Sequence, residues 1–194
     1  MSPSTIILII LLVPAFYISI AYNVLVRLRN EIEAAWRQIE VQLKRRHDLI
    51  PNLVEAVKGY MQFERDTLTQ VVEARNRALA ATSQAQKVTA ENELSAGLGR
   101  LLAVMERYPE LKADQNVLRL QEELTTTENQ IAFARQAYND LVAQYNTRIQ
   151  SFPMNFIAPR FGFTTAEYFK VAPEQEAVPR VDLSIDTGSA SGNS

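Results

Sequence analysis

The stretch QNVLRLQEELTTTENQIAFARQAYNDLVAQYNTRIQ, residues 115–150, decides the fold of this chain. Its apolar and small residues recur at alternating intervals of three and four: Val117, Leu120, Leu124, Thr127, Ile131, Ala134, Tyr138, Leu141 and Tyr145. That spacing predicts one amphipathic helix about 54 Å long. A stripe this regular needs other helices to cover it. The chain offers such helices itself, so we expect an antiparallel up-and-down bundle, although an intermolecular coiled coil would use the same pattern.

A long helical segment opens the predicted bundle. Apolar residues recur every three or four positions from Leu25 to Tyr60, and we expect Trp36 and Tyr60 to belong to the core. The spacing continues across Pro51, which favours one helix with a bend at that residue. The alternative is that Asp48 caps a new helix whose first turn tolerates the proline.

Two shorter helices are expected between this segment and residues 115–150. The first covers residues 64–81. Its inward face is expected to hold Leu68, Val72, Arg75 and Leu79. Residues 82–87 have few apolar side chains and predict a turn, and residues 88–108 predict a helix that Pro109 ends. Residues 27–150 are therefore expected to form a four-helix bundle.

The N-terminal segment, residues 1–26, contains no Asp, Glu, Lys, Arg or His. As a helix, TIILIILLVPAFYISIAYNVLV, residues 5–26, would be about 33 Å long, enough to cross a hydrocarbon core of about 30 Å. Pro14 would kink such a span without forbidding it. A cleaved signal peptide is the alternative, but it would need basic residues before the apolar run and a cleavage site after it. We therefore expect an uncleaved transmembrane anchor that contacts the lipid bilayer through residues 5–26.

Charges flanking the span predict its orientation. Arg27, Arg29 and Arg37 follow the span closely, whereas only the chain amine precedes it. The positive-inside rule then places the N-terminus outside and the bundle in the cytoplasm.

The C-terminal part changes in character after Gln150. Residues 151–171 are rich in aromatic side chains: Phe152, Phe156, Phe161, Phe163, Tyr168 and Phe169. We expect these rings to pack on the end of the bundle; the alternative is a second membrane contact near Arg160 and Lys170. Thr164–Glu167 fits a capping box and predicts a short helix. Residues 172–194, rich in Pro and Glu and then in Ser and Gly, are expected to be disordered.

The composition excludes several classes of function. The chain has no cysteine, which excludes disulfides, thiolate nucleophiles and cysteine-bound metals. Its single histidine, His47, argues against multi-histidine metal sites and most histidine-based catalysis. With 20 basic and 22 acidic residues, the net charge of −2 gives no general attraction to nucleic acid. We expect no catalytic residue, cofactor, metal ion, nucleic acid or small-molecule substrate.

The densest charge cluster, Lys44 to Asp48, supplies candidate contact residues. Its ordinary interpretation is a solvated helix face or loop. It begins 18 residues beyond Val26, about 27 Å along a rigid helix and beyond a Debye length of about 8 Å, which favours a protein partner over lipid. The candidates for partner contact are Arg45, Arg46, Asp48 and Asn52. A structural alternative is that Asp48 and Asn52 satisfy backbone groups around Pro51.

Neighbouring carboxylates leave one enzymatic alternative open. The pairs are Glu31 with Glu33, Glu91 with Glu93, and Glu122 with Glu123. Adjacent or i+2 residues diverge on a helix, so we interpret these pairs as solvated faces. A hydrolase that uses carboxylates from different helices remains an alternative without a motif to support it.

Several separated motifs resemble one known family. The stretch WRQIEVQLKRRHDLIPNLVEAVKGY, residues 36–60, closely resembles the signature of the LemA family of bacterial membrane proteins. The similarity covers roughly residues 20–170. It continues in TL…V…AR (67–75), RYPELKAD (107–114), LQEELTTTENQIAFARQAYNDLVAQYN (120–146) and FP (152–153).

The resemblance implies an N-terminal transmembrane helix followed by an up-and-down four-helix bundle. Some family members resemble lipoproteins with a lipid-bearing cysteine, and this chain differs from them because it has no cysteine. Similar domains in magnetosome membrane proteins imply a link with membrane organisation. Relatives are also often encoded near a membrane metalloprotease of envelope quality control. The family has no established catalytic residues, so the resemblance assigns none.

We therefore expect an all-α, non-enzymatic scaffold or interaction protein of the bacterial inner membrane. Its expected partner is an envelope membrane protein, such as a quality-control protease, or a second copy of the chain. A homo-oligomeric protein that shapes or organises membranes is the main alternative.

We expect the natural protein to stay in the membrane fraction after alkaline carbonate extraction, because residues 5–26 are retained as a span. Mass spectrometry of the extracted membranes should identify the N-terminal peptide. Recovery of the protein from the soluble fraction without residues 1–26 would show that the segment is a cleaved signal.

Overall fold

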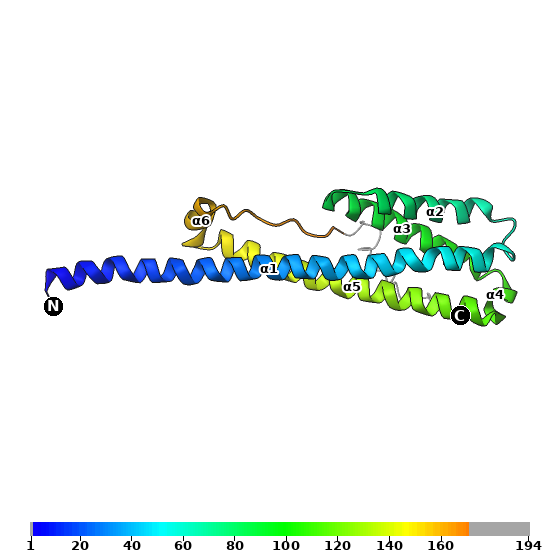
Figure 1. The fold of residues 1–194 in the computed structure, drawn as a ribbon, viewed down its shortest axis with the longest axis horizontal. Helices are drawn as coiled ribbons and strands as arrows, with labels where there is room; N and C mark the ends of the chain where they lie inside the picture. The colour runs from blue at the N-terminus through cyan, green and yellow to red at the C-terminus, as the bar shows by residue number, and fades with distance from the viewer. Residues whose placement is uncertain (1, 171–194) are drawn as a thin grey trace, which may run out of the picture.

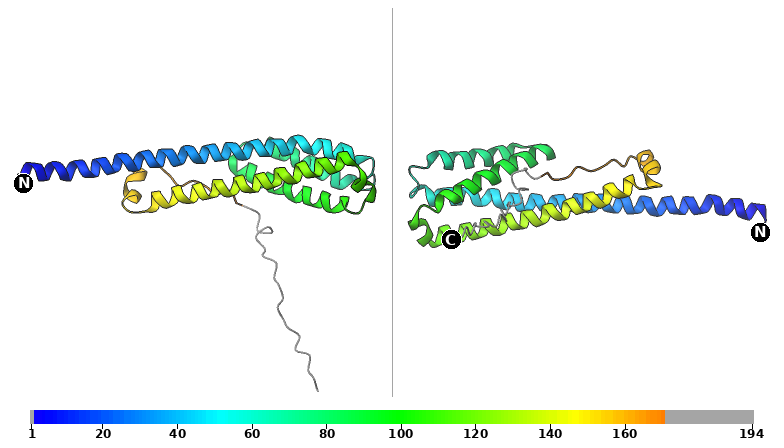
Figure 2. Two further views of the ribbon diagram at one scale, coloured as in Figure 1. Left: turned by 90° about the horizontal axis from the view of Figure 1, so that it is seen from below. Right: turned by 180° about the vertical axis from the view of Figure 1, so that it is seen from behind.

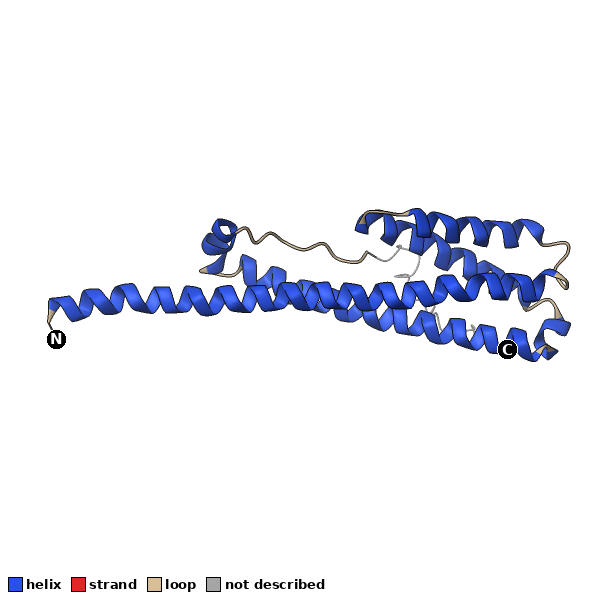
Figure 3. Cartoon of the chain, in the orientation of Figure 1, coloured by secondary structure: helices blue, strands red, loops and turns tan. Residues whose placement is uncertain are grey.

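A single helix connects the apolar N-terminal segment to the rest of the molecule. The structure is a computed structural model that describes residues 2–170, and all regular elements in this range are helical, which confirms the predicted fold class (Figure 3). Helix α1 (Pro3–Lys58) has 56 residues and passes through Pro14 and Pro51 without ending. The single-helix interpretation at Pro51 is therefore the one observed. The predicted boundary between anchor and bundle, at residue 26, lies inside this helix.

The remaining helices run back and forth along α1 (Figures 1 and 2). They are α2 (Arg65–Ala80), α3 (Gln84–Met105), α4 (Pro109–Ala113), α5 (Gln115–Gln150), α6 (Met154–Ile157) and the 3₁₀ helix η1 (Ala158–Phe161). Helices α2 and α3 lie beside only the C-terminal part of α1, whereas α5 follows α1 much further toward the N-terminus. The bundle therefore has four helices at the end far from the apolar segment and two near it.

Side-chain caps set the starts of two helices. Asp114 accepts hydrogen bonds from the amides of Asn116 and Val117 at 2.9 and 3.2 Å and so caps α5. Ser83 and Gln86 form a capping box at the start of α3. That box lies within the predicted turn 82–87, so α3 begins earlier than expected.

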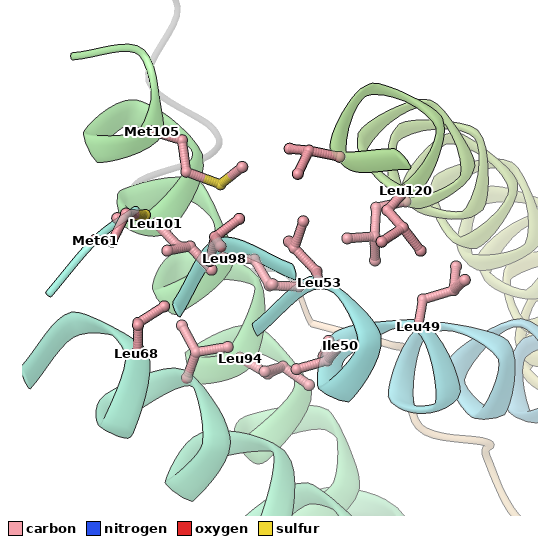
Figure 4. Close-up of a cluster of buried hydrophobic side chains, with 14 of the residues drawn as sticks. Leu49, Ile50, Leu53, Met61, Leu68, Leu94, Leu98, Leu101, Met105 and Leu120 are labelled. Carbon is pink, nitrogen blue, oxygen red and sulfur yellow. The ribbon is translucent and has the colours of Figure 1, made fainter. Parts of the chain in front are cut away.

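The four-helix end contains the larger apolar core (Figure 4). Side chains from α1, α2, α3, α4 and α5 converge there, among them Ile50, Leu53, Val71, Leu94, Leu101 and Leu124. The inward face of α2 differs from the expected one, because Leu68, Val71, Ala74 and Ala78 are buried whereas Leu79 is exposed. Tyr60 is also exposed, against expectation, and its hydroxyl donates to Asp114 Oδ2 over 3.2 Å.

The two-helix end is closed by residues that follow α5. Phe163 and Phe169 insert into a second apolar core between α1 and α5, together with Leu25, Ile39 and Tyr138. Trp36 is half-buried beside this core, with its ring centroid 5.5 Å from that of Tyr138. Residues 163–170 form no helix, so the short helix predicted at Thr164–Glu167 is wrong.

Two asparagines of α5 hold this extended segment in place. The side-chain amide of Asn139 donates to the carbonyl of Phe169 and accepts from its amide, at 3.1 and 2.8 Å. Asn146 makes the same pair of bonds with Ala166, at 2.9 and 2.8 Å. Because the two asparagines lie seven residues apart, they share one face of α5. Their amides satisfy backbone groups that a helix would have satisfied internally.

The stripe along α5 is covered by helices of the same chain. Most of its predicted members are buried, and Ala134 and Leu141 are half-buried. From Ile131 onward the buried positions shift to Arg135, Val142 and Ile149. A seven-residue repeat drifts by about 20° per heptad on a helix with 3.6 residues per turn, which accounts for the shift. The stripe needs no second chain to be buried, so the bundle interpretation is the one observed.

The first part of α1 projects beyond the bundle with its apolar side chains exposed. This segment is long and apolar enough to cross a membrane. The side chains from Ile6 to Phe16 are exposed, and partial burial begins only at Ile18. The expected disorder of residues 172–194 lies outside the described residues.

We predict that Leu124→Asp destabilises the bundle, because Leu124 is buried in the four-helix core and an unpaired carboxylate there costs at least about 3 kcal/mol. Thermal unfolding in detergent should show a clear fall in melting temperature. Leu118→Asp is the matched control, since Leu118 lies on the same helix with a partly exposed side chain. Equal melting temperatures for the two variants would contradict this placement of the α5 stripe.

Candidate functional site

The basic run of α1 divides between the inside and the outside of the bundle. Arg46 and His47 are buried, whereas Lys44, Arg45 and Asp48 are exposed. The helix itself causes this division, because successive residues are rotated by about 100°. Arg46 has no exposed surface, so the prediction that it meets a partner at the surface is wrong.

Arg46 joins α1 to two other helices. Its Nη1 donates to Ser95 Oγ of α3 and to Glu128 Oε1 of α5, each over 2.7 Å. Its Nη2 pairs with the Glu91 carboxylate and donates to the Glu91 backbone carbonyl over 3.3 Å. A guanidinium presents several donors in a fixed plane, so one side chain can serve these partners at once.

Glu91 lies at the centre of this buried cluster. Its Oε1 lies 2.9 Å from His47 Nε2. Burial raises the pKa of the Glu91 carboxyl, but the hydrogen bond from His47 and the charge of Arg46 outweigh burial and hold that pKa below its ordinary value. The sequence predicts that Glu91 and Glu93 both lie on solvated faces. Glu93 is exposed and pairs with Arg77 over 3.3 Å, whereas the expectation for Glu91 is wrong.

Helix α2 contacts the turn of α1 that contains Pro51. A proline has no amide hydrogen, so Pro51 cannot donate to the carbonyl of His47, four residues earlier. Arg75 of α2 donates its Nε–H to that carbonyl over 2.7 Å. Asp48 and Asn52 are exposed and make no side-chain hydrogen bond among the described residues, so they do not satisfy the backbone around Pro51.

A second buried arginine lies on α5 near the cluster. Burial lowers the pKa of Arg135 to about 10, with the positive charge of Arg46 as a further cause. The Arg135 guanidinium lies 4.4 Å from the centre of the Phe169 ring, a cation–π contact that holds the extended segment 163–170 against α5. With its pKa near 10 the side chain remains charged at neutral pH.

The sequence-based predictions omit Ser95, Glu128 and Arg135 and place Glu91 on a solvated face. They place Arg75 on the inward face of its helix but do not predict its hydrogen bond to the His47 carbonyl. One signal was available for Arg46, because it follows Ile39 and Leu43 on the apolar stripe of α1. A charged residue at such a position needs a partner from another helix. The spacing of residues along α1 does not predict which helix supplies that partner.

The contacts within the cluster indicate a structural role. Both carboxylates that reach Arg46 are paired with it, and a paired carboxylate is a weak general base. Within residues 2–170 no group of three or more acidic, histidine or cysteine side chains is placed to hold a metal ion. A groove of about 790 Å³ lies at the far end between α1 and α2, lined partly by Val54, Met61 and Thr69, and contains none of the cluster residues.

Three of the four predicted contact residues share an exposed face. Arg45, Asp48 and Asn52 are exposed at intervals of three and four, which places them on one side of α1. Val41 continues the same face and is exposed although apolar. We call Val41, Arg45, Asp48 and Asn52 the outer stripe of α1. Its role in binding stays a prediction.

Comparisons with known proteins agree on one family. Residues 35–183 match the model of the LemA family. The chain is 26% identical over 162 residues to Protein LemA of Metamycoplasma hominis, covering 83% of this chain and 72% of that protein. It is also 26% identical over 178 residues to Magnetosome protein MamQ 2 of Paramagnetospirillum magneticum, covering 78% of this chain. This chain spans 65% of the length of that magnetosome protein, slightly less than two thirds.

We predict that Glu91→Gln lowers the free energy of unfolding by about 3 kcal/mol at pH 7, because it removes the buried charge that pairs with Arg46 and His47. The folded-state pKa of Glu91 is depressed, so the stability that its charge contributes is present above the unfolded pKa of about 4.3. That stability is lost as the pH falls through the folded pKa. Denaturant unfolding should therefore show the two proteins converging below about pH 4.

Glu93→Gln is the control for this comparison. Glu93 lies two residues away in an exposed ion pair, which contributes less than about 1 kcal/mol. A loss of stability for Glu93→Gln as large as that for Glu91→Gln would show that the buried cluster has no special role.

Proposed function

This chain belongs to the LemA family, whose model matches residues 35–183. On this basis we propose that the protein is a non-enzymatic scaffold or interaction protein of the bacterial inner membrane. Its family and its apolar N-terminal helix indicate a membrane-associated helical protein. The continuity of α1 is the observation that carries the scaffold proposal. One helix passes from the apolar segment to the outer stripe without a break, so the stripe is held at a fixed distance from the apolar segment.

The bundle has the features of a rigid support. Its buried cluster ties α1 to α3 and α5 through Arg46, and Arg75 ties α2 to the same turn. The two carboxylates in the cluster are occupied by Arg46 and hold it in place. These contacts support a binding role over a hydrolytic one.

Charges after the span support the proposed topology. Arg27 and Arg29 are exposed directly after the apolar segment and pair with Glu31 and Glu33 on the same helix. Basic residues weigh more than acidic ones in setting orientation. We therefore place the N-terminus outside and the bundle in the cytoplasm.

The position of the outer stripe limits the class of partner. Arg45 lies 19 residues beyond Val26, about 29 Å along α1, and Asn52 lies about 10 Å further. Lipid headgroups are out of reach at that distance along a straight helix. We propose that the partner is an envelope membrane protein with a domain on the same side, such as a quality-control protease. Confinement of both proteins to one membrane raises their effective concentration, so a weak contact suffices.

Self-association is the second candidate, and exposed apolar side chains favour it. Val41 in the outer stripe and Phe133 on α5 are both largely exposed. A homo-oligomer of parallel bundles would organise the membrane around it, and the similarity to proteins named for the magnetosome agrees with such a role.

In-cell photo-crosslinking tests the proposal. A photoreactive amino acid placed singly at residues 45, 48 or 52 should give adducts, because these exposed positions share the outer stripe. Residue 119 is the control, since Arg119 is exposed on a different helix, α5. Arg45→Glu should weaken the adducts formed from residue 48, whereas Arg119→Glu should leave them unchanged.

The mass of each adduct distinguishes the candidates. An adduct of twice the chain mass identifies a second copy, and any other discrete mass identifies a protein partner for sequencing. No adduct at any of the three positions, or the same adducts at residue 119, would contradict a binding role for the outer stripe.

A further inference from the structure

Three exposed phenylalanines lie at the end of the bundle nearest the apolar segment. The exposed fractions of Phe152, Phe156 and Phe161 are 82%, 61% and 52%. The Phe152 and Phe156 rings lie edge to face with centroids 6.4 Å apart, and Phe161 lies 5.6 Å from Tyr22 of α1. We call these three phenylalanines the aromatic platform. It is continuous with the exposed surface of α1 through Tyr22.

The depth of the platform follows from the length of the apolar segment. About 20 residues of helix are needed to cross the hydrocarbon core of a bilayer. Counted from Thr5, they end at Val24, and Val24 packs against the same core cluster as Phe163 and Ala158. Figure 1 shows α6 beside this part of α1. A membrane that encloses the apolar segment therefore reaches its interface at the level of α6 and η1.

The charges around the platform suit an anionic surface. Arg148, four residues before Phe152 in the chain, and Arg160, next to Phe161, are both exposed, and Arg160 Nη1 donates to the Phe156 carbonyl over 2.6 Å. Residues 151–163 contain no Asp or Glu. Large exposed aromatic surfaces are unfavourable in water, whereas aromatic rings are favourable at the membrane interface.

We propose that the aromatic platform inserts into the membrane interface beside α1, with Arg148 and Arg160 facing the phosphates of anionic lipids. The bundle then contacts the membrane at two places, α1 and the α6–η1 end. The second contact restricts rotation of the bundle about the axis of α1. The proposal rests on the membrane anchoring in the proposed function, but not on the identity of any protein partner.

The absence of cysteine from the chain allows a direct depth measurement. Single variants Phe156→Cys and Phe161→Cys of the full chain are spin-labelled and reconstituted in phosphatidylethanolamine–phosphatidylglycerol vesicles. Collisions of each label with oxygen, which enriches in lipid, are compared with those of a water-soluble nickel chelate. Phe63→Cys is the matched control, because Phe63 is 96% exposed in the loop between α1 and α2, at the end of α1 opposite the apolar segment. Leu11→Cys reports on the span itself.

We expect the oxygen-to-nickel accessibility ratio at 156 and 161 to exceed that at 63 by several-fold and to approach that at 11. Equal ratios at 156, 161 and 63, with a lipid-exposed label at 11, would overturn the platform and leave the anchor intact. A nickel-accessible label at 11 would overturn the anchor as well. Labels at 156 and 161 that neither reagent reaches would show protein contact in place of lipid.

Lipid composition tests the part of the proposal that concerns charge. In phosphatidylcholine vesicles the labels at 156 and 161 should become shallower, with a lower oxygen-to-nickel ratio. Arg148→Gln with Arg160→Gln should produce the same shift in the anionic vesicles. Unchanged ratios in both experiments would remove the anionic-lipid contact from the proposal.

Discussion

The burial of one positive charge constrains how α1 packs against α3 and α5. Arg46 lies within the bundle with no access to water, so its guanidinium needs partners at the places where α3 and α5 supply them. A buried charge without a partner costs several kcal/mol, and helices that slid past one another would separate Arg46 from Glu91 and Glu128. The apolar contacts supply attraction between the helices, whereas this ion pair selects one register among those that would bury similar area.

Periodic segments were predictable from the sequence, and the reason is physical. The stripes on α1 and α5 must be buried wherever the helices go, so their spacing alone predicts helix type and inward face. The face of α2 was predicted less well because it is built from Ala74 and Ala78, which give a weaker apolar signal than Leu79. Glu91 continues the spacing of Leu94, Leu98 and Leu101 on α3, which separates it from Glu93 in the sequence. That Glu91 pairs with Arg46 was not predictable, because only the assembled bundle brings the two stripes together.

In the segment after α5, tertiary contacts outweigh the local sequence pattern that predicted a helix. The residues Thr164–Glu167 have the local pattern of a helix start, yet they are extended. Asn139 and Asn146 offer this backbone two pairs of hydrogen bonds, and Phe163 and Phe169 bury their rings only when the segment lies along α5. The free energy of burying two aromatic rings exceeds the small preference that a capping box gives to a short helix.

Because α1 is continuous, a change in its tilt moves the whole bundle with it. A helix that is longer than the local bilayer thickness tilts to keep its apolar residues in hydrocarbon. From Val26 to Lys58 the helix extends about 48 Å, so a tilt of about 10° displaces its far end sideways by about 8 Å. With the apolar segment spanning a bilayer, as proposed, thinning or thickening of that bilayer would move a point well away from the lipid. A hinge at residue 26 would absorb that movement, and this chain has none.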